Sequence, residues 1–125
     1  MKNYSTYQDL EIWKLSRSLV KKIYLITDKF PESEKFGLTN QIRRASVSIP
    51  SNIAEGYGRQ YRKETIQFIT VARASLNELE TQLILSLDLE FITELLTQES
   101  FDLIQSLRRG INGYMKYLKN SEHLT

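Results

Sequence analysis

Apolar residues recur along most of the chain at steps of three and four positions, the spacing that places side chains on one face of an α-helix. Four such runs predict helices over residues 7–29, 34–56, 63–87 and 94–119. No stretch shows the alternation of a half-buried strand. The positions predicted to form the buried stripes are Ile12, Leu15, Leu19, Ile23, Ile26, Phe30, Leu38, Ile42, Ala45, Ile49, Ile53, Thr65, Ile69, Ala72, Leu76, Leu79, Leu83, Leu96, Ile104, Leu107, Ile111, Tyr114 and Leu118.

Capping and helix-breaking residues fall between these runs. Ser5 or Thr6, the latter with Asp9 three residues later, is placed to cap the first helix, and Pro31 ends it. Gly56 and Gly58 end the second helix. The predicted fold class is therefore all-α: an antiparallel up-and-down four-helix bundle with short connections.

Two of the predicted helices are apolar on a second face. The residues on that face are Arg43, Val47, Pro50 and Ala54 in the second helix, and Val71, Ala74 and Leu85 in the third. Isolated apolar residues on a surface are normal. A four-helix chain, however, has no further element to cover such faces, which favours a homo-oligomer with Val47, Pro50 and Val71 at its interface.

Pro50 lies within the second helix, where it has no N–H to donate and its ring crowds the carbonyl of Ser46. The expectation is a packed bend in the helix. The side chains expected to satisfy the released carbonyl group are those of Ser46, Ser48, Ser51 and Asn52.

The chain has 125 residues, a length that suits one domain over residues 1–125. It has no cysteine, which excludes disulfides, thiolate metal sites and cysteine nucleophiles, and fits a reducing compartment. No run of 18 or more apolar residues is present, so no membrane partner is expected. The predicted location is the cytoplasm.

The charge is distributed unevenly although the net charge is only +2. Residues 43–73 hold six Lys and Arg against two acids, a balance of +4, whereas residues 78–102 hold seven acids and no base, a balance of −7. Such alternation suits helices that pair with oppositely charged neighbours, in the same chain or in another copy of it.

Enzymatic chemistry has little support. The only histidine is His123, close to the C-terminus, so a triad or a histidine-containing metal site lacks its central group. Gly56 and Gly58 match no phosphate-binding motif. Glu78 and Glu80 lie about 200° apart on a helix and cannot share a proton. The chain is therefore predicted to be no enzyme and to hold no cofactor or metal.

A nucleic-acid site is the best-supported binding function. Arg59, Tyr61, Arg62 and Lys63 lie where the second and third helices connect, just after Tyr57. Such a segment can neutralise phosphates while a ring stacks on an exposed base; the alternative is a solvated loop. A ring of identical subunits would repeat this patch and strengthen weak contacts.

Arg43 and Arg44 have two possible roles. They could contact a nucleic-acid backbone, or form ion pairs with the acidic segment over residues 78–102. Glu55 is about 16 Å from Arg44 along the helix, too far for a hydrogen bond. The ion-pair role is favoured, for Arg44 especially, and Arg43 stays a candidate nucleic-acid contact.

A family resemblance supports this interpretation. The segments FGLTNQIRRASVSIPSNIAEGYGR and IQFITVARASLNELETQL resemble the bacterial four-helix bundle proteins, also called 23S ribosomal RNA intervening-sequence proteins. The resemblance covers nearly the whole chain and implies a homopentameric ring without enzymatic activity. It extends to the accessory protein of diversity-generating retroelements, which binds a reverse transcriptase and nucleic acid. Residues that match the motifs, and are candidate structural or interface positions, are Arg43, Arg44, Asn52, Glu55, Arg59 and Glu78.

The prediction that follows is a cytoplasmic, non-enzymatic homo-oligomer that binds RNA or DNA through a repeated basic surface. The alternative is a scaffold that docks a partner protein such as a reverse transcriptase.

Overall fold

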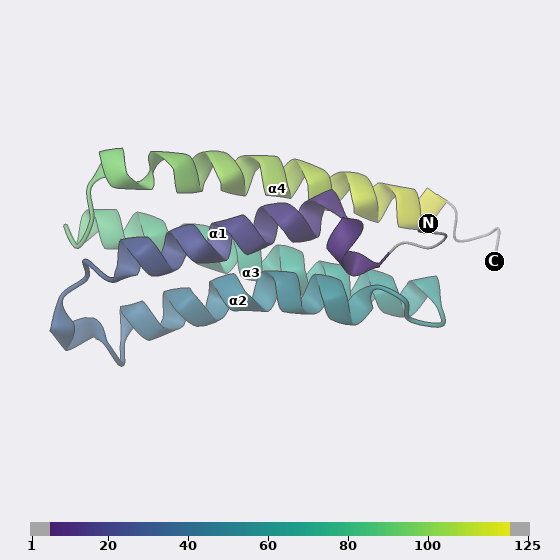
Figure 1. The fold of residues 1–125 in the computed structure, drawn as a ribbon, viewed down its shortest axis with the longest axis horizontal. Coiled ribbons are helices and arrows are strands. Elements are labelled where there is room, and N and C mark those ends of the chain that lie inside the picture. The colour runs from purple at the N-terminus through teal and green to yellow at the C-terminus, as the bar shows by residue number, and fades with distance from the viewer. Residues whose placement is uncertain (1–5, 121–125) are drawn as a thin grey trace.

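The computed structural model describes residues 6–120, which form four long helices and no strand (Figure 1). The all-α class with four helices is thereby confirmed. The long helices are α1 (Glu11–Thr27), α2 (Leu38–Gly56), α3 (Arg62–Asp88) and α4 (Glu94–Asn120). Two short 3-10 helices, η1 (Tyr7–Asp9) and η2 (Glu32–Glu34), precede α1 and α2.

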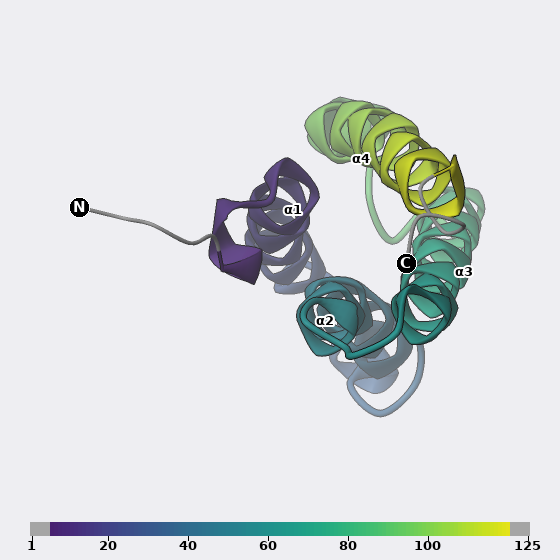
Figure 2. The ribbon, with the colours of Figure 1, turned by 90° about the vertical axis from the view of Figure 1, so that its right-hand side faces the viewer.

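The four long helices form a bundle. Each helix packs against the next one in the chain, and α1 also packs against α4, so the helices surround one core (Figure 2). That core contains nearly all the apolar positions predicted from the helical spacing, and twelve of its large side chains are less than 2% exposed. Leu15, Leu38 and Tyr114 are only partly buried against it.

The first helix begins later than predicted. Thr6 and Asp9 do form a capping box, in which the Thr6 hydroxyl oxygen accepts from the backbone N–H of Gln8 at 3.2 Å. The turn that they cap is η1, because Leu10 adopts extended backbone (φ −71°, ψ 130°) and interrupts the helix. The α-helix therefore runs from residue 11 to 27, not from 7 to 29.

The second helix also begins later, at Leu38 instead of residue 34. Gly37 has non-helical backbone (φ −109°, ψ −115°) and separates η2 from α2. The Glu34 carboxylate accepts from the backbone N–H of Leu38 at 3.0 Å and so replaces an N-cap side chain. The other two helices lie within one residue of their predicted bounds, and Ser5 and His123 lie outside the described residues.

The helix α2 continues through Pro50 without a break in its helical assignment. The Asn52 amide donates to the Ser48 carbonyl oxygen at 2.8 Å, one turn earlier. The Ser46 hydroxyl donates to the Arg43 carbonyl oxygen at 2.8 Å. These polar side chains therefore bond the backbone around Pro50, at the carbonyl groups of Arg43 and Ser48 and not at that of Ser46 as predicted.

One predicted core position is wrong. Leu96 is 46% exposed, whereas Thr97 and Ser100 are buried. With 100° of rotation per residue, Thr97 lies about 20° from the direction of the buried Ile104, and Leu96 about 80° from it. The helical phase set by the rest of α4 therefore turns Leu96 toward solvent.

Candidate nucleic-acid interface

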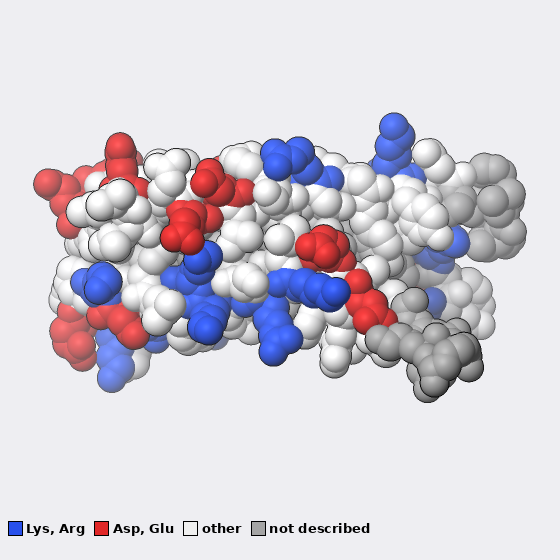
Figure 3. Space-filling view, turned by 45° about the horizontal axis from the view of Figure 1, so that its top comes forward, with Lys and Arg blue, Asp and Glu red and all other residues white. Residues whose placement is uncertain are grey.

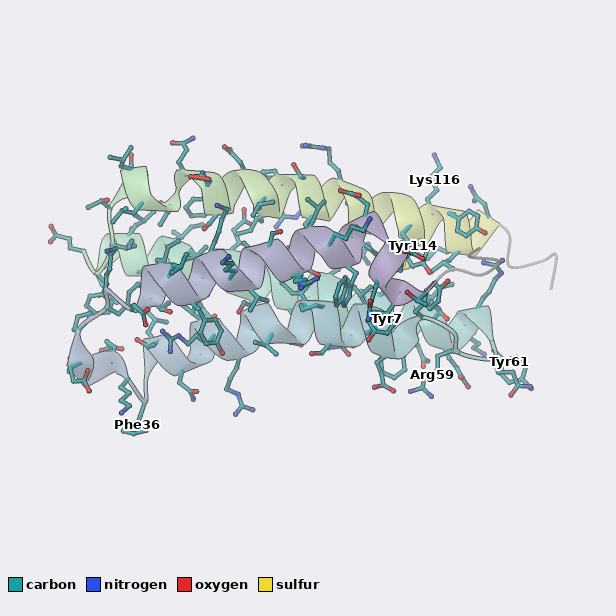
Figure 4. The ribbon with its side chains drawn as sticks, viewed as in Figure 1. Tyr7, Phe36, Arg59, Tyr61, Tyr114 and Lys116 are labelled. Atoms are coloured by element: carbon teal, nitrogen blue, oxygen red, sulfur yellow. The ribbon has the colours of Figure 1, made fainter. Side chains whose placement is uncertain are left out.

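The connection between α2 and α3 lies at the same end of the bundle as the last turns of α4 (Figure 4). Gly58 makes the reversal possible with a positive φ of 78°, which a residue without Cβ adopts at no steric cost. The Thr65 hydroxyl donates to the Gly56 carbonyl oxygen at 2.8 Å and ties α3 to the end of α2. The geometry of this connection is thus held by contacts within the chain.

Aromatic rings and a guanidinium gather at this end. Tyr114 and Tyr117 of α4 stack with centroids 6.3 Å apart and an interplanar angle of 14°. The Arg62 guanidinium, at the start of α3, lies 5.4 Å from the centroid of the Tyr117 ring. The Nε of Arg62 is buried and has no hydrogen-bond partner in residues 6–120. We refer to Tyr57, Tyr61, Arg62, Tyr114 and Tyr117 as the tyrosine end.

Burial raises the pKa of Tyr114 above its ordinary value of 10.0. The neighbouring phenols of Tyr57 and Tyr117 raise this pKa further, because their ionisation would place like charges beside it, and Arg62 acts in the opposite direction. Tyr114 is therefore a neutral hydroxyl at physiological pH.

Several side chains at this end face solvent. Tyr61 is 58% exposed and lies at the tip of the bundle (Figure 4). The exposed lysines are Lys63 in the first turn of α3 and Lys116 and Lys119 in the last turns of α4. Exposed aromatic rings can stack on bases, and lysines close to them can neutralise phosphates.

Arg59 is bound more tightly to its own chain than the sequence indicated. Its Nη2 forms an ion pair with the Glu55 carboxylate at 2.8 Å, and its Nε donates to the Glu55 carbonyl oxygen at 3.2 Å. The guanidinium also lies 4.6 Å from the centroid of the Phe68 ring. Of the residues predicted to contact nucleic acid, Tyr61 and Lys63 are exposed and form no ion pair with the described residues.

Arg43 lies away from the tyrosine end, about 20 Å along α2 from Gly56. Its Nε donates to the Thr27 hydroxyl oxygen at 2.8 Å, and its Nη2 pairs with the Asp28 carboxylate at 2.9 Å. The guanidinium is also 4.4 Å from the centroid of the Tyr24 ring. The structure places Arg43 in a contact between α2 and α1, so the partner predicted for it within residues 78–102 is wrong.

Arg44 forms no ion pair with the described residues. It lines a shallow groove between α2 and α3 together with Glu78, the nearest acid of the predicted segment. The arginine that does pair with that segment is Arg108 of α4, whose Nη2 lies 2.7 Å from a carboxylate oxygen of Glu80. Arg108 reaches Glu80 across the contact between α3 and α4.

The second apolar face predicted from the sequence is exposed in part, since Pro50 and Ala54 are half-buried. Val47 on α2 is 40% exposed, and Val71 on α3 is 47% exposed. Asn52, by contrast, is half-buried and bonded to its own helix, as described above.

The sequence analysis missed two basic or aromatic groups. Tyr114 was predicted only as a core position and Tyr117 was not singled out, although their i, i+3 spacing was a signal for ring contact. The second group is an exposed stripe of bases on α1, formed by Lys14, Arg17 and Lys21. On the face shown in Figure 3, Lys and Arg run along the middle of the molecule, and acids gather at the end where α4 begins.

The described residues contain neither a cluster of metal ligands nor a helix suited to span a membrane. Among residues 6–120, no three His, Cys, Asp or Glu side chains lie close enough to hold a metal ion. None of the helices in the described part of the chain combines the length and apolarity needed to cross a membrane.

Four helices in one bundle define the class of the protein as an all-α helical-bundle protein. A family model described as 23S rRNA-intervening sequence protein matches residues 8–113 of the chain. The chain therefore belongs to the 23S rRNA-intervening sequence protein family, which confirms the resemblance carried by its motifs. The comparison with curated proteins gives no significant match.

Proposed function

We propose that the protein is a non-enzymatic, cytoplasmic homo-oligomer that binds RNA or DNA through its tyrosine end. In this proposal each chain is an antiparallel up-and-down bundle, and five copies form a ring, as the family resemblance implies. The ring would repeat the tyrosine end around its axis, so that one nucleic acid contacts several copies.

The observation that carries the binding proposal is the chemistry of the tyrosine end. Tyr61 is an exposed ring at the tip of the bundle, and Lys63 is an exposed cation two residues later. A base stacked on Tyr61 would leave its phosphates close to this cation. The stripe of bases on α1 has two rings beside it: Trp13 is partly buried against the core, and Tyr24, although 40% exposed, lies against the Arg43 guanidinium at 4.4 Å.

Support for the oligomer comes from exposed apolar side chains on more than one face. Val47, Val71 and Leu85 are each at least 40% exposed on the outer surfaces of α2 and α3. Leu25 and Leu95 are exposed on α1 and α4. Faces of this kind are commonly covered by another subunit.

The binding proposal is tested by fluorescence anisotropy with labelled single-stranded RNA and DNA of about 20 nucleotides, at salt concentrations from about 50 to 200 mM. We expect affinity to fall linearly with the logarithm of salt concentration. Tyr61→Ala should weaken binding about 5- to 100-fold through lost stacking, and Lys63→Ala should reduce the salt slope.

The matched control is Lys21→Ala, which removes another exposed cation, from α1. It should leave affinity nearly unchanged if the tyrosine end is the site. A larger effect of Lys21→Ala than of Lys63→Ala would move the site to α1, and the absence of salt-dependent binding would overturn the nucleic-acid proposal.

A second candidate function is a scaffold that docks a partner protein such as a reverse transcriptase. It is favoured by apolar exposure at the turn from α3 to α4, where Leu89 is 57% and Leu95 is 86% exposed. Co-purification of a reverse transcriptase with the wild-type chain, and its loss on Leu95→Asp, would support the scaffold.

A further inference from the structure

The connection between α1 and α2 presents one large side chain entirely to solvent. Phe36 is 88% exposed, the highest value among the large apolar residues described. Figure 4 shows it beside the start of α2, pointing away from the bundle. The backbone holds it there, because η2 precedes it and the Glu34 carboxylate caps Leu38 immediately after it. A ring held outward by an ordered connection is placed for contact with another molecule.

A groove of about 190 Å³ lies between the end of α1 and the start of α4. Its apolar wall comprises Leu25, Ile26 and Leu96, and the ion pair between Lys22 and Glu99 at 2.9 Å borders it. A cavity of about 150 Å³ lined by aliphatic side chains is large enough to bind benzene. The groove therefore has the volume and the apolar lining to hold one phenyl ring.

Phe36 and the groove lie at the same end of the bundle but on opposite sides of it. In Figures 1 and 4 the α1–α2 connection lies below α2, and the start of α4 lies at the top, with α1 between them. The ring therefore cannot reach the groove of its own chain. Two different patches on opposite sides of one subunit are the requirement for a head-to-tail contact between copies.

We infer that Phe36 of one copy inserts into the groove between α1 and α4 of the next copy. This inference rests on the homo-oligomer proposed above and assigns the surfaces that join its subunits. The charges beside the two patches are complementary: Lys35 lies next to Phe36, with its Nζ 5.6 Å from the ring centroid, and Glu99 lies at the edge of the groove with an exposed carboxylate. Glu32, which lines a pocket together with Lys35, likewise has a counterpart in Lys29 of the groove.

The absence of cysteine allows a direct test by cross-linking. Two single variants, Phe36→Cys and Leu96→Cys, are purified separately, mixed in equal amounts and oxidised with copper phenanthroline. Both positions are exposed, so the fold should be retained, and thermal unfolding followed by circular dichroism verifies it. The control mixture pairs Phe36→Cys with Leu85→Cys, a similarly exposed leucine on α3.

The inference predicts a disulfide-linked dimer in the first mixture, at a yield at least tenfold above that of the control. The double variant Phe36→Cys/Leu96→Cys should link whole rings into a ladder that ends at the subunit number. Light scattering on the wild-type chain provides the separate readout. An oligomeric wild type without the specific cross-link overturns the assigned surfaces and leaves the oligomer intact, whereas a monomeric wild type overturns both.

Discussion

The hydroxyl oxygen of Thr27 accepts a hydrogen bond of 2.8 Å from Nε of Arg43. Thr27 is itself buried at the end of α1, where its hydroxyl donates to the carbonyl oxygen of Ile23 at 2.7 Å. The two bonds form a short chain that joins α2 to the last turn of α1. Arg43 therefore has a structural role in this chain, since its guanidinium is already occupied by side chains from α1.

Removal of this contact should destabilise the bundle. Arg43→Ala deletes three hydrogen bonds of a charged group and a cation–π contact, and should lower the free energy of unfolding by about 1–2 kcal/mol. The measurement is urea denaturation. The neighbouring Arg44→Ala, whose guanidinium has no ion pair in the described residues, should change it by about 0.5 kcal/mol or less. Equal effects of the two substitutions would contradict the assignment.

The ion pair between Glu80 and Arg108 should stabilise the contact between α3 and α4. Both side chains are only 24% exposed, and Arg108 also donates to the Asn77 amide oxygen at 3.0 Å. Glu80→Gln should lower the free energy of unfolding by about 1 kcal/mol. The matched control is Glu99→Gln, whose carboxylate is 78% exposed and whose pair with Lys22 should contribute about 0.5 kcal/mol or less. A reversed order would show that exposure does not set the strength of these pairs.

Gly56 should not accept a larger side chain. A Cβ added there would lie 2.7 Å from the Cβ of Phe68, an atom close to the backbone that cannot swing away. Gly56→Ala should therefore cost about 1–3 kcal/mol of stability through overpacking between α2 and α3. Gly113→Ala is the control, because nothing lies within 4 Å of its added Cβ. That substitution should raise stability by about 0.5–1 kcal/mol, and similar melting temperatures for both variants would refute the prediction.

Because of Tyr114, the stability of the protein should fall as the pH rises in the alkaline range. Its pKa is raised in the folded state above the ordinary 10.0, so the unfolded chain loses this proton first as pH rises. The unfolded state then binds fewer protons than the folded state, and stability falls. The contribution of the Tyr114 proton to the free energy of unfolding is fully present below pH 10.0 and is lost as the pH rises above this value.

The measurement compares the wild type with Tyr114→Phe by denaturation on both sides of pH 10.0. The wild type should lose more stability than the variant as pH rises through this value. Parallel pH profiles for the two proteins would show that Tyr114 titrates normally.

The helical stripes were predictable because buried positions in a helix follow its rotation per residue. Residues such as Ile42, Ile49 and Ile104 were identified as core from spacing alone and are fully buried. Leu96 was predicted to be buried because, near the end of a helix, the apolar spacing does not distinguish between two successive positions as the buried one. The start of α2 was misplaced because the η2 turn uses residues that are equally suited to a helix.

The candidate site was less predictable, because the positions of charges along the sequence do not show which side chains form ion pairs in the folded chain. Arg43 and Arg59 were candidate contacts for nucleic acid in the sequence. In the structure each guanidinium forms an ion pair with a neighbouring acid and lies against an aromatic ring. Tyr114 was predicted as a core position, and nothing in the sequence singled out Tyr117. Only the approach of α4 to the start of α3 brings Tyr117 to the guanidinium of Arg62.

The four helices, most of the core and the family follow from the amino-acid sequence alone, because they depend on periodic apolar positions and on local motifs. The tertiary structure decided which arginines are occupied, which tyrosines meet at one end, and that Phe36 and the groove at Leu96 lie on opposite sides of the bundle. These relationships depend on how helices distant in the chain approach one another. These relationships are set by the packing of the helices and by the length of the side chains between them, and no single segment of the sequence specifies that packing.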